Sequence, residues 1–396
     1  MYDVRVDNAR IFDPEDGSFR EGAVLIDRGL VAGVGPEVQN PARQIIDARG
    51  QTVVPGLIDE HVHIDYEGSL IGANADTLCV PCGITSVCDG GTCGVSSFGQ
   101  FLRSNLMRYE AHGYAYLNVQ TYGNKSVCLH EEDHDPADFR ADLITACFQR
   151  HKEVLRGLKI RLCRGTLGNS GLGLAALEAA QAIATALKAQ GFHCPLVVHY
   201  GDLPEDLRLE DILRRLKAGD IVAHILQTHG ETIFEDAGGM AGIGGIKECV
   251  LEARARGVIF DDCHGRVHWS FASLEKAGRA GFKPDIISSD NIRLSEYQIP
   301  GFSLLYAMAA QSAAGMATND ILHSVTAAPA RALGISERAG CIHEGMPADL
   351  TILEIRHPEN LILHDNEGQS RPARELFVPL LTMISGRVAF RQIFFI

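Results

Sequence analysis

The chain has 396 residues, of which 46% are hydrophobic and 22% charged, and its formal net charge is −14. That length accommodates a barrel of about 250 residues together with an accessory unit. Nucleic-acid-binding domains are usually basic, so the acidic balance argues against a nucleic-acid partner. It does not exclude an anionic small substrate, because an arginine or a metal ion can dominate the charge inside a cleft.

The first residues, Met1–Arg5, show no basic segment followed by an apolar one, so no signal peptide is expected. No apolar run reaches the length of a membrane span. Eleven cysteines without a secretory signal indicate reduced thiols. We therefore expect a cytoplasmic protein without a membrane partner. Cys79 and Cys82 have the spacing of a metal or redox pair, but no second pair matches them, and we predict buried cysteines.

Both ends of the chain are rich in short β-type segments. The N-terminal ones are Val4–Ile11, Gly22–Asp27 and Leu30–Gly33, and the C-terminal ones are Asp349–Ile355 and Val388–Ile396. No long helical pattern occurs in the first 54 residues. We therefore predict one small β-sandwich domain built from both termini, residues 1–54 and 345–396.

The middle of the chain, residues 55–344, alternates short apolar strands with amphipathic helices, which is the pattern of βα units. Eight strands are predicted, at Leu57–Ile64, Gly83–Asp89, Tyr114–Gln120, Leu158–Cys163, Pro195–Tyr200, Asp220–Leu226, Val258–Cys263 and Asp285–Asp290. Helices are predicted between them, at Leu174–Gln190, Leu209–Ala218, Ile246–Arg256 and Phe302–Ala314.

The fold class that follows is α/β, a TIM-like (β/α)₈ barrel. A doubly wound open sheet is the alternative, but no Gly-rich phosphate loop follows the first strand. The Gly-rich stretch 238–245 follows no strand and lacks a Lys-Ser or Lys-Thr ending, so we interpret it as a mobile loop and not as a phosphate cradle.

Chemistry-bearing residues fall at the ends of the predicted barrel strands. His61 and His63 end the first strand, where residues two apart share a face, so both imidazoles can bind one zinc ion. Further candidates at later strands are Lys159, His199, His224 and Asp290. Active sites of such barrels lie at the C-terminal ends of the strands, where these side chains can converge.

Three segments carry a resemblance to a known family: Val54–His63, Pro81–Val87, and the return from Gly334 to Leu350. Together they resemble the amidohydrolase superfamily. The segment Phe260–Gly265 is similar to that of its dihydroorotase-like deacetylases, although Ile292 stands where that subgroup often has a histidine two residues after the strand-eight aspartate.

The resemblance implies a binuclear site of divalent metal ions, with zinc as the expected metal. His61, His63 and Asp290 would hold the buried ion. The second ion would be held by His199 and His224. The departure at Ile292 leaves the substrate open and does not touch this set of ligands.

The resemblance further implies that Lys159 is carboxylated by CO₂, and that the resulting carbamate bridges the two ions. Two such cations lower the pKa of a shared water towards neutrality. Asp290 is then expected to accept the proton of that water and to deliver it to the leaving group.

Two more residues are candidates for substrate contacts. Arg161 follows Lys159 by two residues on the same strand and could bind a substrate carboxylate, or it could form a salt bridge in the barrel mouth. His264 could contact the substrate or support a ligand. By contrast, we interpret His130 and His134, in an acidic loop, as part of a solvated charge cluster.

We therefore expect a metal-dependent hydrolase that cleaves an amide or ester bond and deacetylates a small N-acetyl or O-acetyl acid. The alternatives are a cyclic amide hydrolase of the dihydroorotase or hydantoinase kind and a non-catalytic barrel scaffold, since one fold hosts many functions. The expected partner is a small acylated substrate, and a homo-oligomer is compatible with the sequence.

Overall fold

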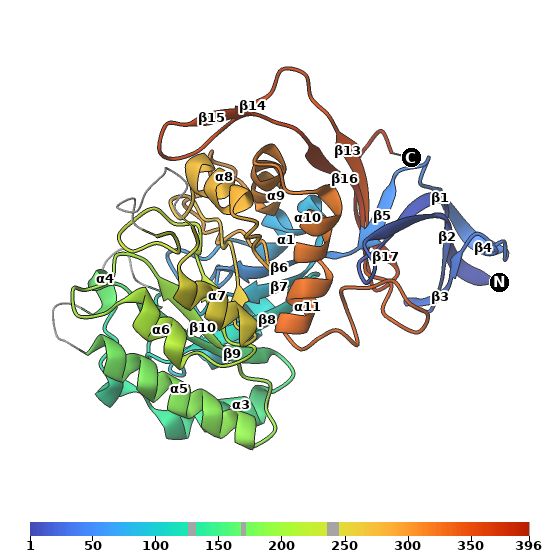
Figure 1. Cartoon of the computed structure of the whole chain (residues 1–396). Coiled ribbons are helices and arrows are strands. Elements are labelled where there is room, and N and C mark those ends of the chain that lie inside the picture. The colour runs from blue at the N-terminus through green and yellow to red at the C-terminus, as the bar shows by residue number, and fades with distance from the viewer. Residues whose placement is uncertain (126–131, 168–171, 236–244, 396) are drawn as a thin grey trace.

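A computed structural model describes residues 1–125, 132–167, 172–235 and 245–395, and it contains two large sheets (Figure 1). The first sheet draws its strands from both ends of the chain. Its strands are β1 Tyr2–Asp13, β2 Ser18–Asp27, β3 Leu30–Gly35, β4 Ala42–Asp47, β5 Thr52–Pro55, β13 Leu350–Arg356, β16 Leu376–Ile384 and β17 Arg387–Arg391.

In this terminal sheet the order is β17-β16-β13-β5-β1-β2-β3, and β4 pairs with β1. The two chain ends meet where β5 and β13 pair antiparallel, with Leu350 opposite Pro55. The pairing confirms that both termini build one sheet. The predicted strand Val388–Ile396 is shorter than expected, ending at Arg391, and β16 was missed. The sandwich form and the domain boundaries stay predictions.

One C-terminal segment leaves the terminal sheet. The hairpin of β14 Ile362–His364 and β15 Ser370–Pro372 lies over α8 Phe271–Arg279 and α9 Leu304–Ala313 (Figure 1). Asp365 accepts a hydrogen bond from the Phe271 backbone N–H at 2.9 Å, and Arg371 pairs with Glu275. This part of residues 345–396 therefore packs on helices of the middle region.

The second sheet is formed by the middle of the chain. Its strands are all parallel, in the order β12-β11-β10-β9-β8-β7-β6. They are β6 Leu57–Val62, β7 Ile84–Asp89, β8 His112–Asn118, β9 Leu155–Leu162, β10 Leu196–Tyr200, β11 Ile221–Ala223 and β12 Ile259–Phe260.

Helices cover the outside of this curled sheet (Figure 1). The longer ones are α3 Ala141–His151, α5 Gly173–Ala189, α6 Leu209–Arg215, α7 Glu248–Ala255, α8, α9, α10 Thr318–Ser324 and α11 Ala327–Ala332. Short helical turns are α1 Ala75–Leu78, η1 Val80–Cys82, α2 Phe98–Phe101, η2 Leu102–Leu106, η3 Pro136–Asp138 and α4 Arg164–Leu167. The four predicted helices of the middle region are confirmed by α5, α6, α7 and α9.

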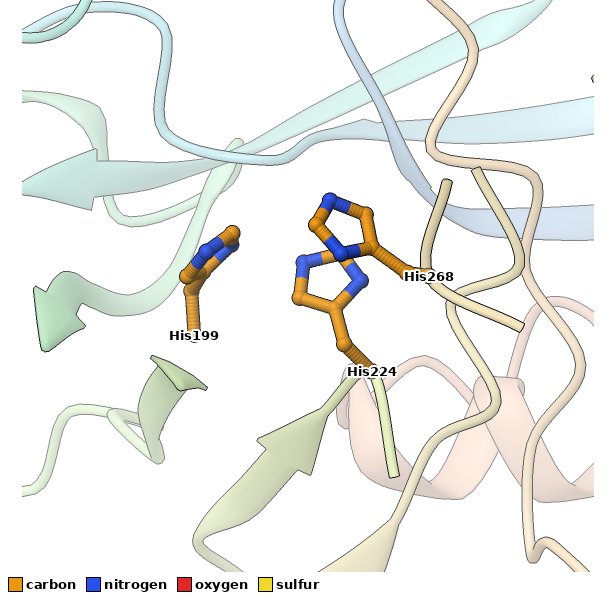
Figure 2. Close-up of side chains that lie close together, drawn as sticks. All are labelled: His199, His224 and His268. Carbon is orange, nitrogen blue, oxygen red and sulfur yellow. The ribbon is translucent and has the colours of Figure 1, made fainter. Parts of the chain in front are cut away.

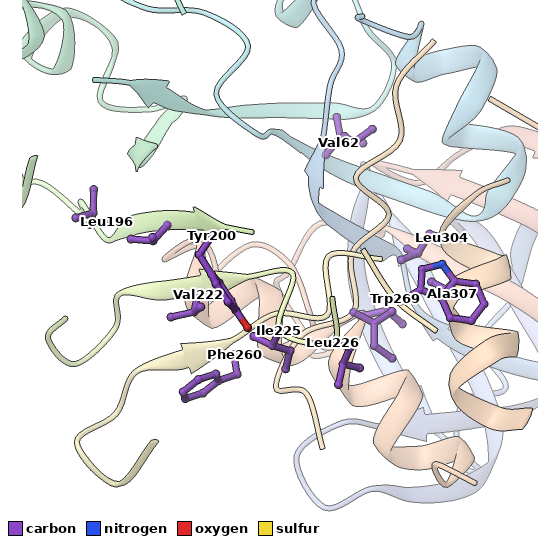
Figure 3. Packing of buried hydrophobic residues seen from close by; sticks show 14 of the residues in the cluster. Val62, Leu196, Tyr200, Val222, Ile225, Leu226, Phe260, Trp269, Leu304 and Ala307 are labelled. Atoms are coloured by element: carbon purple, nitrogen blue, oxygen red, sulfur yellow. The ribbon is translucent and has the colours of Figure 1, made fainter. Parts of the chain in front are cut away.

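Alternating residues of the parallel strands face opposite sides. In β10, Leu196, Val198 and Tyr200 belong to the large core under the helices, part of which Figure 3 shows. Val197 belongs instead to a second cluster inside the curl of the sheet. Because side chains alternate along a strand, His199 follows Val197 on the inner side. The local pattern therefore places this imidazole inside the sheet.

The predicted eighth strand, Asp285–Asp290, is not a strand in the structure. It makes one isolated bridge, between Ile286 and Asp261. Even so, it lies between the first and last strands: the Asp290 N–H donates to His61 O at 2.7 Å, and the His264 N–H donates to Ser288 O at 2.9 Å. Its backbone turns left-handed at its last residue, Asp290 (φ 45°), which ends the extended conformation there.

Cys79 and Cys82 are buried and free, as predicted. Burial raises the pKa of Cys82 to about 12, which suits an inert packed thiol and not a redox pair. Within the described ranges, no helix has the length and apolarity needed to cross a bilayer. The Gly-rich stretch falls outside the described residues up to Gly244, so its interpretation stays a prediction.

Candidate metal centre

A cavity of about 150 Å³ opens at the C-terminal ends of the parallel strands. Most of the residues singled out from the sequence line it. The lining residues are His61, His63, Ile71, Asn124, Lys159, Arg161, His199, His268, Asp290 and Ile292. His224 lies directly beside them, with its ring centroid 4.3 Å from that of His199. The structure therefore brings together all six expected ligands.

One part of the centre, here named the His61 half-site, consists of His61, His63 and Asp290. Asp290 Oδ1 lies 3.4 Å from His63 Nε2 and 3.8 Å from His61 Nε2. Burial alone would raise the pKa of Asp290, but its contact with His63 and the nearby imidazoles outweigh the effect of burial and hold that pKa well below its ordinary value. Asp290 is therefore an ionised carboxylate in this setting.

Hydrogen bonds fix which nitrogen of His63 faces the cavity. Its Nδ1 lies 2.7 Å from Thr92 Oγ1, and that hydroxyl donates its own proton to Asp89 Oδ2 at 2.8 Å. The hydroxyl oxygen can then only accept from His63, so Nδ1 carries the proton. The lone pair of Nε2 is left towards Asp290, which is the arrangement that a metal ligand needs.

The second part, here named the His199 half-site, consists of His199, His224 and His268, whose rings gather around one space (Figure 2). The His268 ring centroid lies 4.0 Å from that of His224 and 5.4 Å from that of His199. The ligand nitrogens of the three lie within 4.8 Å of one another. His224 donates from Nδ1 to Cys263 O at 2.8 Å, so its Nε2 carries the lone pair, and the Cys263 thiol lies 3.9 Å from that nitrogen.

These imidazoles are neutral in the metal-free protein. Burial lowers the pKa of His61, His199 and His224 well below the ordinary value of 6.5. Burial likewise lowers the pKa of His268 to about 4. A metal ion binds the neutral imidazole, so the donors need lose no proton when an ion arrives near neutral pH.

Lys159 lies at the junction of the two half-sites, with its Nζ 3.0 Å from His61 Nε2. Burial lowers the pKa of this amine, which favours the neutral form that can react with CO₂. Two glycines make room for the pair. A Cβ on Gly91 would lie 2.5 Å from Lys159 Cβ, and one on Gly90 would lie 2.3 Å from His61 Cδ2.

Left-handed backbone recurs at the centre. His224 (φ 65°), Cys263 (φ 42°) and Asp290 (φ 45°) each adopt it without being glycine. Such residues are strained by about 1–3 kcal/mol each, and they persist where surrounding structure holds them. The left-handed backbone of His224 explains why β11 ends at Ala223, earlier than predicted, and the chain after β12 turns at Cys263.

The donor set fits divalent metal ions such as zinc. Imidazole and carboxylate are its usual non-thiolate ligands, and the outer nitrogens of His63 and His224 are held by protein acceptors while the inner ones face the cavity. One group of histidines lies on each side of Lys159, so the arrangement can accommodate two ions.

Arg161 lines the cavity but is engaged in an ion pair with buried Glu132. Glu132 also accepts from His134 Nε2 at 2.7 Å and from Asn118 Nδ2 at 3.0 Å. The pKa of Glu132 lies well below its ordinary value because Arg161 and His134 outweigh the effect of burial. The prediction of a solvated charge cluster is therefore wrong for His134, which is buried; His130 lies outside the described residues.

His264 does not line the cavity. Its ring stacks on Trp269 with centroids 3.9 Å apart, and its Nδ1 lies 3.2 Å from Asp262 Oδ2. Sequence reasoning missed His268 instead, four residues further on. It lies in an irregular loop that follows a strand of the parallel sheet. A histidine in such a loop is the sequence signal that could have identified it.

The chain is similar to several known proteins. Residues 266–389 match the amidohydrolase family. A deacetylase of Enterococcus faecalis is 28% identical over 366 residues, which cover 92% of this chain and 94% of that protein. The chain is also similar to a crystal structure of an adenine deaminase (TM-score 0.88, 27% identity, 99% and 100% of the two chains covered) and to one of a dihydroorotase (0.86, 25%, 98% of each).

Proposed function

We propose that this chain, which carries an amidohydrolase-family domain and is a hydrolytic enzyme acting on C–N bonds, uses two divalent metal ions to deacetylate a small N-acetyl or O-acetyl acid. The observation that carries the proposal is the convergence on one cavity of six predicted ligands, from the ends of β6, β9, β10 and β11 and from the segment 285–290. We also propose that the curled parallel sheet is a closed (β/α)₈ barrel, in which residues 285–291, beside β6, take the place of the eighth strand.

The residues have distinct roles in this proposal. When bound, the ions, with zinc as the expected metal, lower the pKa of a water and polarise the scissile carbonyl. His61, His63 and Asp290 hold one ion and His199 and His224 the other. Lys159, as a carbamate, supplies an anion between them.

Asp290 is the proposed proton carrier. It is ionised, as the direction of its pKa indicates, and so it can accept a proton at neutral pH. Its Oδ1 contacts the inner nitrogens of the His61 half-site, and Oδ2 lies 3.9 Å from His268 Nε2 on the other side. A carboxylate between the two groups can take a proton from the nucleophile and release it to the leaving group.

The proposed substrate carries a carboxylate next to the acylated atom. Arg161 is the cationic side chain suited to bind it, because Glu132 holds Nη1 while Nε and Nη2 have no acceptor among the described residues. A guanidinium with two free N–H groups can bind a carboxylate bidentately. The similarity to a deacetylase supports the acetyl group as the acyl part.

A cyclic amide hydrolase is the second candidate, and the similarity to the structure of a dihydroorotase favours it. The same metal centre serves both reactions. A non-catalytic scaffold is disfavoured, because that role gives no reason for so many neutral imidazoles to face one cavity.

A substrate panel tests the proposal. The zinc-loaded protein is assayed for acetate release from N-acetyl amino acids and O-acetyl hydroxy acids of both chiralities, for ring opening of dihydroorotate and a hydantoin, and for ammonia release from adenine. We expect turnover of an acetylated acid that chelation abolishes and zinc restores. Turnover confined to a cyclic ureide or to adenine would overturn the deacetylase assignment, and a protein that binds no metal would overturn the whole proposal.

A further inference from the structure

We propose that His268 is a metal ligand, completing with His199 and His224 a three-imidazole site for the second ion. The inference rests on the proposed function, since it concerns one of the two ions named there. It adds a residue from the β12–α8 loop that neither the strand pattern nor the family resemblance provides.

The three rings have the spacing of ligands that share an ion (Figure 2). Zinc–nitrogen bonds of about 2.0–2.1 Å at tetrahedral angles place ligand nitrogens about 3.3 Å apart. The nitrogens of His199, His224 and His268 lie within 4.8 Å of one another, so modest ring rotations bring them to that separation. The tilted His224 and His268 rings are the closest pair, with centroids 4.0 Å apart.

His268 has no other partner that accounts for its position. Among the described residues its ring nitrogens make no hydrogen bond, and the nearest carboxylate oxygen, Asp290 Oδ2, is 3.9 Å away. The His268 side chain is half-buried, with 21% of its surface exposed, and no described residue uses the lone pair of its ring. A metal ion bound between the three rings would do so.

The loop is built to hold His268 at this place. The next residue, Trp269, is fully buried, stacks on His264 and packs edge-on against Phe271. Ser270 then caps α8, its Oγ accepting from the Ser273 N–H at 3.1 Å. With its C-terminal neighbours anchored in this way, the imidazole is directed towards the cavity.

Gly265 makes the approach of His268 to the site possible. Its backbone is left-handed (φ 57°), and a Cβ there would lie 3.0 Å from both Asp290 Oδ2 and His268 Cδ2. Such contacts are tighter than normal van der Waals spacing. A side chain at this position would therefore force the His268 ring or the Asp290 carboxylate to shift by a few tenths of an ångström.

The experiment measures zinc content and zinc affinity, not activity. Wild-type protein, His268→Asn and the control His229→Asn, an exposed histidine in a nearby loop, are dialysed against a chelator series, and bound zinc is counted by mass spectrometry. Cobalt(II) loading gives a visible spectrum that reports the ligand number. Circular dichroism checks that each variant is folded.

We expect wild type and His229→Asn to bind two ions, and His268→Asn to bind one of them at least tenfold more weakly with a changed cobalt spectrum. The inference is overturned if zinc affinity changes by less than tenfold and the cobalt spectrum is unaltered. A variant in which only KM rises is such a case, and it would mean that His268 contacts substrate. If wild type itself binds no metal, the proposed function fails instead.

A second pair of variants covers the case in which His268→Asn does not fold. Gly265→Ala and Gly281→Ala both place alanine in left-handed backbone, but a Cβ at Gly281 meets nothing within 4 Å. Both should lose similar stability. We expect only Gly265→Ala to weaken the second ion, and equal zinc affinity in the two variants would contradict the role of His268.

Discussion

The two half-sites of the candidate metal centre are built in different ways. In the His61 half-site, His61 and His63 lie on one strand end, and the Asp290 backbone donates to His61 O at 2.7 Å. In the His199 half-site, His199 lies on β10, His224 follows β11 and His268 lies in the β12–α8 loop, and the three meet through ring contacts alone.

The outer hydrogen bonds differ as well. Thr92 holds His63, one of two imidazoles in the His61 half-site, and the Cys263 carbonyl holds His224, one of three in the His199 half-site; among the described residues, the outer nitrogens of the other three imidazoles have no acceptor. Ligands held by outer partners bind metal more tightly. We therefore expect the His61 half-site, which local backbone preforms, to hold its ion more firmly, and the His199 half-site, which depends on loops, to exchange its ion more readily.

The largest effect should come from Asp290, which joins the two half-sites. Asp290→Asn keeps an oxygen ligand but cannot accept a proton at neutral pH, so we expect kcat to fall about 100-fold or more with the fold retained. Asp285→Asn, on the same segment but half-exposed, is the matched control and should keep its kcat. If metal-loaded Asp290→Asn kept more than about a tenth of the wild-type kcat, the proton-carrier role would be wrong.

Lys159→Ala tests whether one anion bridges the half-sites. Because a protonated amine repels cations, we expect a ligand role only for the carbamate, and the variant should lose bound zinc together with rate. Added formate or acetate should partly restore both. Lys217→Ala, at the surface, is the control. A fully metallated, active wild-type enzyme with a bare Lys159 amine, measured by ¹³CO₂ labelling, would contradict the bridging role.

Arg161 should have a smaller effect, restricted to binding. Arg161→Met should raise KM for acidic substrates about tenfold and spare neutral analogues. Removing one partner of a buried ion pair is itself destabilising, so Arg161→Met is compared with the double variant that adds Glu132→Gln. Equal losses of kcat/KM for acidic and neutral substrates in the double variant would indicate a structural arginine.

The last prediction concerns stability and not turnover: it is a pH dependence in the metal-free protein. The pKa of His268 is about 4 when folded and 6.5 ordinarily, so the unfolded chain binds the extra proton between these values. The stability present above pH 6.5 is then lost as pH falls towards 4, by at most about 3 kcal/mol.

His268→Asn lacks this contribution. The free energy of unfolding of the variant minus that of wild type should therefore increase as the pH falls from 7 to 4.5. The opposite contributions of Asp59 and Glu60, whose pKa burial raises to about 7, are common to both proteins and cancel in the difference. Denaturant unfolding of both apoproteins at the two pH values measures it. A difference that stays constant with pH would show that His268 does not titrate as expected.

Much of the His61 half-site could be predicted from the sequence, because its logic is local. Residues two apart on a strand share a face, so His61 and His63 needed no tertiary information. The same period places Lys159 and His199 on the inner side of their strands, as the core clusters confirm for their neighbours Leu158 and Val198, which face the helices.

Tertiary structure decided the rest, because the causes are long-range. His268 depends on Trp269 being buried and on Gly265 leaving room, and neither fact is written in the spacing of histidines. In the sequence, Glu132 and His134 lie in a polar loop and are expected to be solvated. In the structure both are buried, and Glu132 pairs with Arg161. Period and composition determined which strands carry chemistry; only the folded chain determined which loop residues meet at their ends, because such contacts join segments with no shared local pattern.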